Sequence, residues 1–372
     1  MLVVAIVSTG SKSNMLKIAV YAISKNEEKF AKRFADTCSL ADHVVVVDTG
    51  SSDSTVEILR ENNVSVYQAK QSLFRFDEAR NMALALVPAD VDICIALDLD
   101  EVLPDGWREK VEAAWTNGVT KLWYDFIWSW SPDNKPAVVY RHSKIHSRDN
   151  YRWVAACHEY LVPIDRAKTK EVFVEGLEIW HFQDWTKPRG SYLNLLKIQL
   201  NESPEDPRSI HYYGRELVFQ GQYVEATSML RKYFKFAKEP SNYDALTYKY
   251  LAIARKNLGD IAGAKGYWQL AAASVKDWRE PYIELIKIAM DEKDWTVGVA
   301  NAMLALMVKT KSTSYYSDLS RWEIDPYDLG AVCAWYAKYE DLSREWMTKA
   351  IELDSVDERL RKNAEFILQD RK

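Results

Sequence analysis

Short apolar runs alternate with stretches of helical spacing through the N-terminal part of the chain. "KIAVYAIS", "HVVVVDTG" and "DICIALDLD" are such runs, and "EEKFAKRFADTCSLA", "TVEILRENN" and "FDEARNMALALV" have the apolar spacing of helices. A continuous apolar run indicates a strand that is covered on both faces, as in a parallel sheet. Strands that alternate with helices of about 10–15 residues build βαβ units. The sequence therefore predicts an α/β domain with a Rossmann-like, mostly parallel sheet.

A repeated motif marks the C-terminal part of the chain, where nearly every segment has helical spacing. Its copies begin at Gly221, Gly259 and Lys293, and a weaker copy begins at Tyr339. The period of about 34 residues and the pattern "LGD…A…A" resemble tetratricopeptide repeats. One helix pair of such a repeat cannot bury its apolar face alone, so successive pairs stack. We expect an all-α helical-repeat domain, with an irregular helical bundle as the alternative.

The polar segment "ESPEDPRS" separates the two patterns, and 372 residues are enough for two domains. We predict an α/β domain over residues 15–203 and the helical-repeat domain over residues 204–372. The apolar run at the start of the chain is short and lacks a basic leader. Residues 1–14 are therefore expected to be a tail, or to precede an alternative start at Met15. A strand at the edge of the sheet is the other interpretation.

The composition narrows the classes of protein. The net charge of −5 disfavours general binding of nucleic acids through phosphate contacts. The four cysteines form no CxxC pair, which is typical of free thiols in a reducing compartment. No apolar run reaches the roughly 20 residues of a membrane span. We therefore expect a cytoplasmic globular protein, and the sequence does not predict its oligomeric state.

Acidic residues follow two of the predicted strands. Asp48 ends "VVVVD", and Asp98, Asp100 and Glu101 follow "CIAL". In an open α/β sheet, ligands bind beyond the carboxyl ends of the strands. Asp98 and Asp100 would project to the same side of an extended segment, and paired carboxylates suit Mg²⁺ or Mn²⁺, which often bridge to substrate phosphates. A divalent cation and a diphosphate would then balance the clustered negative charge.

Four segments carry a resemblance to a known family. "IAVYAISKNEE", "VVVVDTGSSDST", "DEARNMAL" and "IALDLDEVL" resemble, in order and spacing, the nucleotide-sugar-binding half of a family 2 glycosyltransferase with the GT-A fold. The resemblance covers residues 16–115 and extends more loosely to about residue 200 through "RWVAACHEYL" and "EIWHF". Family 2 members with this "HE" element and a helical-repeat tail form a group that the chain resembles. The resemblance implies an inverting glycosyltransferase that uses Mn²⁺ or Mg²⁺ and a nucleoside-diphosphate sugar.

The resemblance also implies roles for single residues. Asp100 resembles the metal ligand of the family's acidic motif, with Asp98 in support or on the ribose. His181 resembles a late further metal ligand of the family. The residues implied at the nucleotide or its diphosphate are Ser24, Asn26, Glu27, Asp48, Arg80, Asn81 and Asp98.

The sequence leaves a structural role open for three of these residues. Asp48 could merely begin a turn. Arg80 could pair with Asp77 or Glu78 on the surface of its own helix. His181 could be a buried core histidine.

An inverting transfer also needs a base that removes the proton of the acceptor during attack. Glu159 in "CHEY" is the predicted base, and Asp100 is the second predicted catalytic residue. His158 would orient Glu159 or bind phosphate. Glu159 could instead form a salt bridge with Arg141 or Arg152. The alternative bases are Asp125 and Glu101.

The predicted acceptor is a hydroxyl of a protein, a glycan or a modified DNA base, held between the two domains. DNA stays open because residues 141–152 carry four Arg or Lys and two His. The aromatic stripe of "KLWYDFIWSW" could stack a sugar or a base, or be plain core. A non-catalytic helical-repeat scaffold or binding protein with a degenerate GT-A domain is the alternative function. A nucleotidyltransferase is disfavoured, because "AISKNEE" has no glycine for a phosphate loop.

Overall fold

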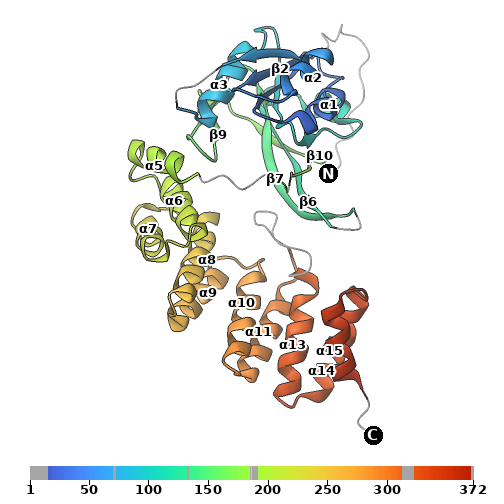
Figure 1. Ribbon diagram of the computed structural model, residues 1–372, viewed down its shortest axis with the longest axis vertical. Coiled ribbons are helices and arrows are strands. Elements are labelled where there is room, and N and C mark those ends of the chain that lie inside the picture. Colours follow the sequence, from blue (N-terminus) through green and yellow to red (C-terminus); the bar gives the residue numbers. More distant parts are fainter. Residues whose placement is uncertain are drawn as a thin grey trace, which may run out of the picture. The chain divides into compact units, whose positions relative to one another are not determined.

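The computed structural model describes residues 16–69, 73–131, 134–184, 186, 192–311 and 322–369, so the predicted tail 1–14 lies outside the described residues. The chain forms two compact units that interleave along the sequence (Figure 1). The first unit takes its described residues from Met1–Tyr124, His142–Val154 and Tyr160–Trp180. The second takes them from Asp125–Arg141, Ala155–Glu159 and His181–Lys372. The two units therefore do not meet at a single point of the sequence. The predicted domains, residues 15–203 and 204–372, stay a prediction.

Within the described residues, an eight-stranded sheet has the strand order β3-β2-β1-β4-β7-β6-β10-β5, and β8 and β9 form a separate antiparallel pair. The strands are β1 (Ile18–Ser24), β2 (His43–Asp48), β3 (Ser65–Gln68), β4 (Ile93–Ala96), β5 (Glu101–Val102), β6 (Lys121–Trp130), β7 (Pro136–Ser147), β8 (Tyr151–Val154), β9 (Tyr160–Pro163) and β10 (Glu171–His181).

Parallel pairing brings the carboxyl ends of the first strands to one edge of the sheet. β1 pairs in parallel with β2 and with β4, and β2 pairs in parallel with β3. Ser24 lies opposite Asp48 at the ends of β1 and β2. β7 then pairs antiparallel with β4, with Ile145 opposite Ile95. The predicted α/β GT-A fold with its mostly parallel sheet is confirmed.

Four helices connect these strands, and their apolar faces pack on the sheet. They are α1 (Glu28–Thr37), α2 (Thr55–Glu61), α3 (Phe76–Leu86) and α4 (Trp107–Ala114), and a 3₁₀ turn spans Arg166–Lys168. In α1 the buried residues Phe30 and Phe34 are one helical turn apart, which gives the helix a single apolar face. β1 and β4 are buried along nearly their whole length, as predicted for central parallel strands.

A polar chain crosses the buried core between β1, β7 and β8. Trp153 Nε1 donates to Tyr21 Oη (2.7 Å), and Tyr21 Oη donates to His146 Nε2 (2.7 Å). His146 Nδ1 donates to the carbonyl of Ser147 (2.8 Å), which fixes its tautomer. Burial lowers the pKa of His146 to about 4, so the imidazole is neutral at physiological pH. The polar side-chain atoms of Trp153, Tyr21 and His146 therefore all have hydrogen-bond partners, and none of these side chains is charged.

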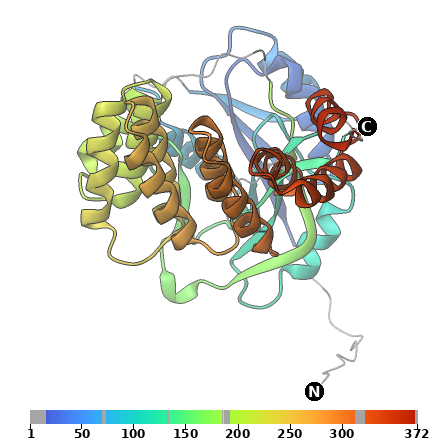
Figure 2. The same cartoon turned by 90° about the horizontal axis from the view of Figure 1, so that it is seen from below.

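The helical part of the second unit consists of antiparallel helix pairs. The pairs α6–α7, α8–α9, α10–α11 and α13–α14 pack together and stack one after another (Figures 1 and 2). The helices are α5 (Leu193–Glu202), α6 (Pro207–Phe219), α7 (Tyr223–Phe236), α8 (Asn242–Asn257), α9 (Ile261–Ser274), α10 (Glu280–Asp291), α11 (Trp295–Met307), α13 (Asp325–Tyr336), α14 (Glu340–Leu353) and α15 (Glu358–Leu368). The predicted all-α helical-repeat domain is confirmed.

The repeated sequence motif encodes the turn inside each pair. In every copy, a residue with positive φ precedes the second helix, and the next N–H donates to the carbonyl five residues earlier. This is the helix-ending pattern in which a left-handed residue lets the chain reverse. The left-handed residues are Gly221, Gly259, Lys293 and Lys338. The corresponding hydrogen bonds are Gln222 to Leu217, Asp260 to Arg255, Asp294 to Ala289 and Tyr339 to Ala334.

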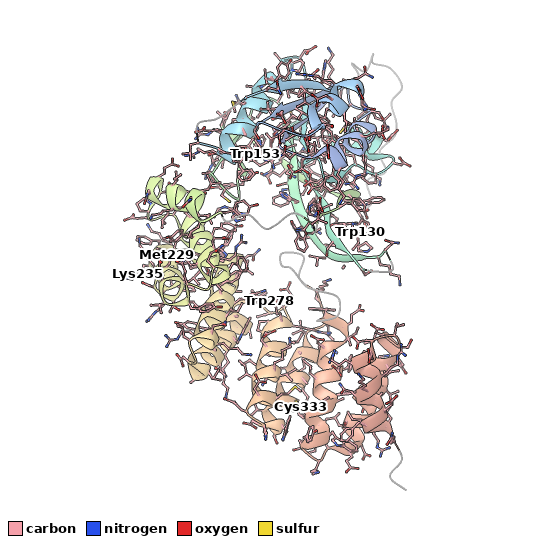
Figure 3. The ribbon with its side chains drawn as sticks, in the orientation of Figure 1. Trp130, Trp153, Met229, Lys235, Trp278 and Cys333 are labelled. Carbon is pink, nitrogen blue, oxygen red and sulfur yellow. The ribbon has the colours of Figure 1, made fainter. Side chains whose placement is uncertain are left out.

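Buried clusters join consecutive helix pairs. Trp278 is 1% exposed and packs with Trp268 and Leu285, which come from α9 and α10 (Figure 3). Cys333 of α13 packs with Val299 of α11 and Trp346 of α14 in a further cluster. All four cysteines are buried and free, which confirms the prediction of free thiols. In the described part of the chain, no helix is long and apolar enough to cross a membrane.

Tyr21→Phe should destabilise the protein by about 1–3 kcal/mol, because it leaves Trp153 Nε1 without an acceptor and His146 Nε2 without a donor in the core. Urea denaturation measures this change. Tyr67→Phe is the matched control, because Tyr67 is 46% exposed and its loss should change the free energy of unfolding by less than about 0.5 kcal/mol. Equal stability of the two variants would contradict the role of the polar chain.

Candidate functional site

The loops after β1 and β2 are joined by the carboxylate of Asp48. Asp48 is fully buried, and its Oδ1 accepts from the backbone N–H groups of Gly50 (3.1 Å) and Ser51 (3.0 Å). Its Oδ2 accepts from the hydroxyls of Ser24 (3.0 Å) and Ser51. Asp48 thus builds the turn at the end of β2 and ties it to β1. The predicted contacts of Ser24 and Asp48 with a nucleotide stay predictions.

A second set of hydrogen bonds ties the same two loops together. Asn26 has a φ of +56°, its backbone N donates to Ser51 Oγ (2.8 Å), and its Oδ1 accepts from the N–H of Ser52 (2.8 Å). Glu27 N donates to Thr55 Oγ1 (2.8 Å) at the start of α2. These bonds bring the N-termini of α1 and α2 together, where backbone N–H groups favour negative charge. Carboxylates of the chain already lie at these helix starts, because Ser54 N donates to Glu28 Oε2 (3.0 Å) and Glu28 N donates to Asp53 Oδ2 (3.3 Å).

The acidic segment after β4 is a turn, and the expected extended conformation is wrong. β4 ends at Ala96, and Glu101 N donates to the carbonyl of Asp98 (2.9 Å). The backbone carbonyl of Asp100 accepts from Arg33 Nη2 (3.4 Å). Because the segment turns, the alternation of side chains in a strand does not apply to Asp98 and Asp100.

Two cations hold the acidic turn together. Arg80 Nη2 lies 2.7 Å from Asp98 Oδ1, and Lys144 Nζ lies 3.2 Å from Asp98 Oδ2. Lys144 Nζ also donates to both oxygens of Glu101, at 2.6 and 2.8 Å. The side chains of Lys144 and Glu101 are only 6% and 3% exposed, whereas that of Asp98 is 34% exposed. We call Arg80, Asp98, Glu101 and Lys144 the ionic cluster.

The pKa values of the ionic cluster follow from these distances. Burial would raise the pKa of Asp98, but the charges of Arg80 and Lys144 outweigh it and hold the pKa well below its usual range. Burial would lower the pKa of Lys144, but the charges of Asp98 and Glu101 raise it. Burial raises the pKa of Glu101 to about 7, with Lys144 opposing the shift. Lys144 therefore stays an ammonium, and Glu101 is protonated before Asp98 as the pH falls.

Arg80 and Asn81 are fixed by Trp153 of β8. The guanidinium of Arg80 lies over the Trp153 ring at 4.9 Å from its centroid (Figure 3 labels Trp153). Asn81 Nδ2 donates to the carbonyl of Trp153, and the N–H of Trp153 donates to Asn81 Oδ1, both at 2.9 Å. Asn81 therefore joins α3 to β8, and its predicted nucleotide contact stays a prediction. The helix partner of Asp77 is Arg75 (3.0 Å), whereas Arg80 reaches Asp98.

Lys144 is a site residue that the sequence analysis missed. It lies on β7 between His142 and His146, two positions from each, so the three residues share a face of the strand. A lysine within a predicted strand was the available signal. Its partner Asp98 is 46 residues away in the sequence, and no local pattern links the two.

Asp100 is the carboxylate of the acidic turn to which the sequence assigns a divalent cation. Both oxygens of Asp98 are engaged by Arg80 and Lys144. No group of three or more His, Cys, Asp or Glu side chains that could hold a metal ion exists among the described residues. Mg²⁺ and Mn²⁺ can bind through one or two carboxylates together with water and substrate phosphates. Half-buried Asp100 suits such a site, and its metal role stays a prediction.

His181 belongs to the second unit, at the end of β10. Its Nδ1 donates to the carbonyl of Trp128 (2.9 Å), and Trp130 Nε1 donates to the carbonyl of His181 (3.1 Å). A histidine that binds a metal through Nε2 commonly donates from Nδ1 to such an acceptor. His181 is half-buried, so it is not a fully buried core histidine. Its predicted share in a metal site with Asp100 is untested, because the two residues belong to different units.

The loop 155–159 contains the predicted base and belongs to the second unit as well. Glu159 is half-buried, and its catalytic role stays a prediction. His158 is held by α6: Arg215 Nη2 donates to His158 Nε2 (2.6 Å), and Arg208 Nη2 donates to the carbonyl of His158 (2.8 Å). The ring of His158 stacks on that of Tyr212, with centroids 4.2 Å apart.

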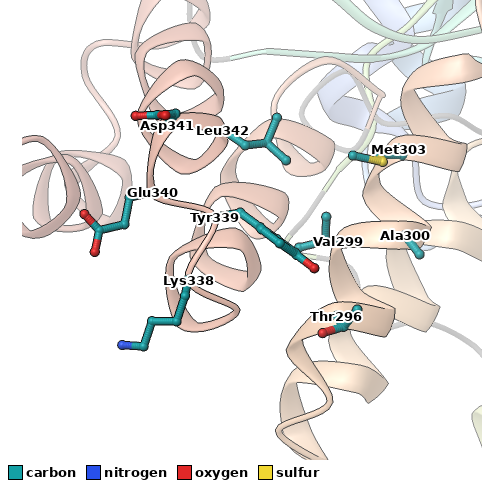
Figure 4. Close-up of a pocket in the computed structure, with 9 residues that line it drawn as sticks. All are labelled: Thr296, Val299, Ala300, Met303, Lys338, Tyr339, Glu340, Asp341 and Leu342. Carbon is teal, nitrogen blue, oxygen red and sulfur yellow. The ribbon is translucent and has the colours of Figure 1, made fainter.

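A pocket of about 570 Å³ lies between α11 and the start of α14 (Figure 4). It is lined by Thr296, Val299, Ala300, Met303, Lys338, Tyr339, Glu340, Asp341 and Leu342. None of the predicted site residues is among them.

Residues 20–158 match the family model described as Glycosyl transferase family 2. The match covers the loops after β1 and β2, α3 and the acidic turn, and it ends within the loop 155–159. It confirms the family 2 resemblance of the α/β part. No curated protein matches the chain.

The solved structures that resemble the chain include tetratricopeptide repeat proteins. YrrB, described as a TPR protein with an unusual peptide-binding site, is 16% identical over 47% of this chain and 81% of its own, with a TM-score of 0.35. TTC0263, a thermophilic TPR protein of Thermus thermophilus, is 16% identical over 48% of this chain and 89% of its own, with a TM-score of 0.34. PilW, described as a type IV pilus biogenesis factor, is 15% identical over 45% and 72%, with a TM-score of 0.36.

Lys144→Met should destabilise the protein by about 3–5 kcal/mol at pH 8, because it removes one partner of a buried ion pair. The deficit should grow as the pH rises from 6 to 9. In the native protein Glu101 binds its proton more tightly than in the unfolded chain, with a pKa of about 7 against 4.5, so its contribution to stability falls as the pH rises from 4.5 to about 7. Without Lys144 the folded-state pKa rises further, and the loss continues above pH 7.

Urea denaturation at several pH values measures this deficit. Lys235→Met is the control, because Lys235 is exposed on α7 (Figure 3) and its loss should leave the pH dependence unchanged. A deficit that is the same at pH 6 and pH 9 would show that Lys144 does not govern the protonation of Glu101.

Proposed function

We propose that this chain, whose residues 20–158 form a family 2 glycosyltransferase domain, is a metal-dependent inverting glycosyltransferase. It would move a sugar from a nucleoside-diphosphate sugar to an acceptor hydroxyl. The observation that carries the proposal is the position of Asp100, at the carboxyl end of β4 and directly beside the ionic cluster. Ligands of open α/β sheets bind at this edge.

The donor side of the reaction needs positive charge at the diphosphate. Arg80 is held by Asp98 and by the ring of Trp153, so its guanidinium is oriented before any ligand binds. An oriented arginine can pair with phosphate in a bidentate way. A cation on Asp100, when bound, would add charge neutralisation of the departing diphosphate.

The acceptor side needs a base that faces the anomeric carbon opposite the leaving group. Glu159 is the proposed base, and Asp125 on β6 is the alternative in the same unit. Inversion requires one displacement, in which the base takes the hydroxyl proton while the bond to the diphosphate breaks. The sugar, the nucleotide and the acceptor class, whether protein, glycan or modified DNA base, are left open by this proposal.

The ionic cluster disfavours the alternative of a binding scaffold with a degenerate site. Two cations and two carboxylates at this depth carry a desolvation cost that apolar residues of the same volume would avoid. The charges of the cluster lie next to Asp100, where the proposal places the diphosphate and its cation. A cytoplasmic location remains part of the proposal.

Asp100→Asn should lower the release of nucleoside diphosphate from the donor by about 100-fold or more in the presence of Mn²⁺, because it removes charge at the proposed cation site. The free energy of unfolding should change little, since the side chain of Asp100 is half-buried and not part of the ionic cluster. EDTA should stop the turnover of the native protein, and added Mn²⁺ or Mg²⁺ should restore it.

Asp105→Asn is the control, because Asp105 is an exposed carboxylate in the same segment. It should keep native turnover. Full turnover of Asp100→Asn at saturating donor would refute the metal site. Activity that EDTA does not change would contradict the proposed metal dependence.

A further inference from the structure

A compact group of basic and aromatic side chains lies where the loop 155–159 meets α6. Arg208, Tyr212 and Arg215 occupy positions i, i+4 and i+7 of α6 and therefore share one face of the helix. All three are half-buried, as is His158. We call His158, Arg208, Tyr212 and Arg215 the His158 cluster.

Both guanidinium groups of the His158 cluster converge on the same ring. The guanidinium carbons of Arg208 and Arg215 lie 4.8 and 4.6 Å from the centroid of Tyr212. Each arginine also donates to a different atom of His158, Arg208 to the carbonyl and Arg215 to Nε2. Because Nε2 accepts a hydrogen bond, the imidazole of His158 is neutral and carries its proton on Nδ1.

The charges of these two arginines also act on His211, which precedes Tyr212 in α6. His211 is fully buried, with Nδ1 2.7 Å from Thr247 Oγ1. Burial lowers the pKa of His211 well below its usual value, and the charges of Arg215 and Arg208 lower it further. Both histidines of the region are therefore uncharged, and the arginines supply its positive charge.

Arg215 has an N–H group that lacks a hydrogen-bond acceptor among the described residues. Its polar contact in the described part of the chain is the hydrogen bond to His158, and no carboxylate pairs with it there. Its Nε is buried without a hydrogen-bond acceptor among the same residues. A buried donor without an acceptor costs about 1–3 kcal/mol. An anion that accepts from Arg215 would remove this cost and offset the repulsion between the two guanidinium groups.

The loop that faces α6 is held in a strained conformation. Ala155 has a φ of +84° and His158 a φ of +55°, in a stretch of four residues without glycine. Such left-handed residues cost about 1–3 kcal/mol each and persist where the surroundings fix them, often at ligand sites. Cys157 anchors the loop, because it packs with Leu196 and Leu217.

We propose that the His158 cluster binds a phosphate group of a ligand. Planar guanidinium forks match the oxygens of phosphate, and two such forks meet at Tyr212. The geometry alone supports the phosphate site, and its link to sugar transfer rests on the proposed function. In that reaction the phosphate is either the diphosphate of the donor or a phosphate carried by the acceptor. The acceptor is the substrate whose hydroxyl proton Glu159 is proposed to take.

Isothermal titration of the full-length protein with inorganic pyrophosphate tests the site without any sugar transfer. Arg215→Gln should weaken binding by about 10-fold or more, because a charged hydrogen bond is lost. Arg215→Lys keeps the charge without the fork and should weaken binding less than Arg215→Gln does. Arg231→Gln is the matched control, because Arg231 is exposed on α7. It should bind pyrophosphate within about 2-fold of the native protein, and native circular dichroism in every variant excludes misfolding.

Nitrogen-15 NMR of the histidine rings gives a second measurement. His158 should show the Nδ1–H tautomer, pyrophosphate should shift its resonance, and Arg215→Gln should change the tautomer balance. His158→Gln assigns the resonance. If Arg215→Gln fails to fold, the comparison of Arg215→Lys with the native protein decides the proposal.

Three results would overturn the phosphate site. The first is that the native protein binds no pyrophosphate. The second is that Arg231→Gln loses as much affinity as Arg215→Gln does. The third is that Arg80→Gln loses binding while Arg215→Gln keeps it. Separate titrations with UDP and GDP then identify the source of the phosphate. Competition with pyrophosphate at the Arg215-dependent site indicates the diphosphate of the donor, and simultaneous binding indicates a phosphate on the acceptor.

Discussion

The contact of Lys144 with Asp98 and Glu101 is the interaction on which the candidate site depends. Without a cation between them, two carboxylates at the end of a buried strand would repel each other. Lys144 comes from antiparallel β7, so the site requires both the parallel strands and the return strand of the sheet. Arg80 completes the balance from α3 and is itself positioned by Trp153. Asp100, next to this balanced cluster, is the carboxylate that the proposal assigns to a cation.

The two compact units do not follow one another along the chain. The loop 155–159 lies between β8 and β9 in sequence, yet it packs with the helical unit. α6 supplies Arg208, Tyr212 and Arg215 to this loop, and Gln199 of α5 accepts from the N–H of Cys157. A truncation after residue 203 would therefore remove the side chains that hold His158. The helices are part of the structure of this loop and not only an appended module.

The sequence patterns predicted the features that depend on local order. The strand ends at Ser24 and Asp48 and the helical repeats that begin at Gly221 and Gly259 follow from short runs of residues, and the structure confirms them. The extended conformation of Asp98–Asp100 was wrong, because the N–H of Glu101 donates to the carbonyl of Asp98 and closes a turn that hydropathy does not encode. The partners of Asp98 and His158 lie tens of residues away in sequence. Such pairings depend on tertiary packing, so the patterns could not predict Lys144 or Arg215.

The most direct test of the central claim is a panel of nucleoside-diphosphate sugars offered to the full-length protein with Mn²⁺. Thermal unfolding and donor hydrolysis would be measured for each sugar nucleotide. The account predicts that at least one donor raises the melting temperature by several degrees, as expected for a ligand far above its dissociation constant, and is slowly hydrolysed. It also predicts that the same sugar without its nucleotide has neither effect. A panel in which no sugar nucleotide changes the melting temperature or is consumed would contradict the account.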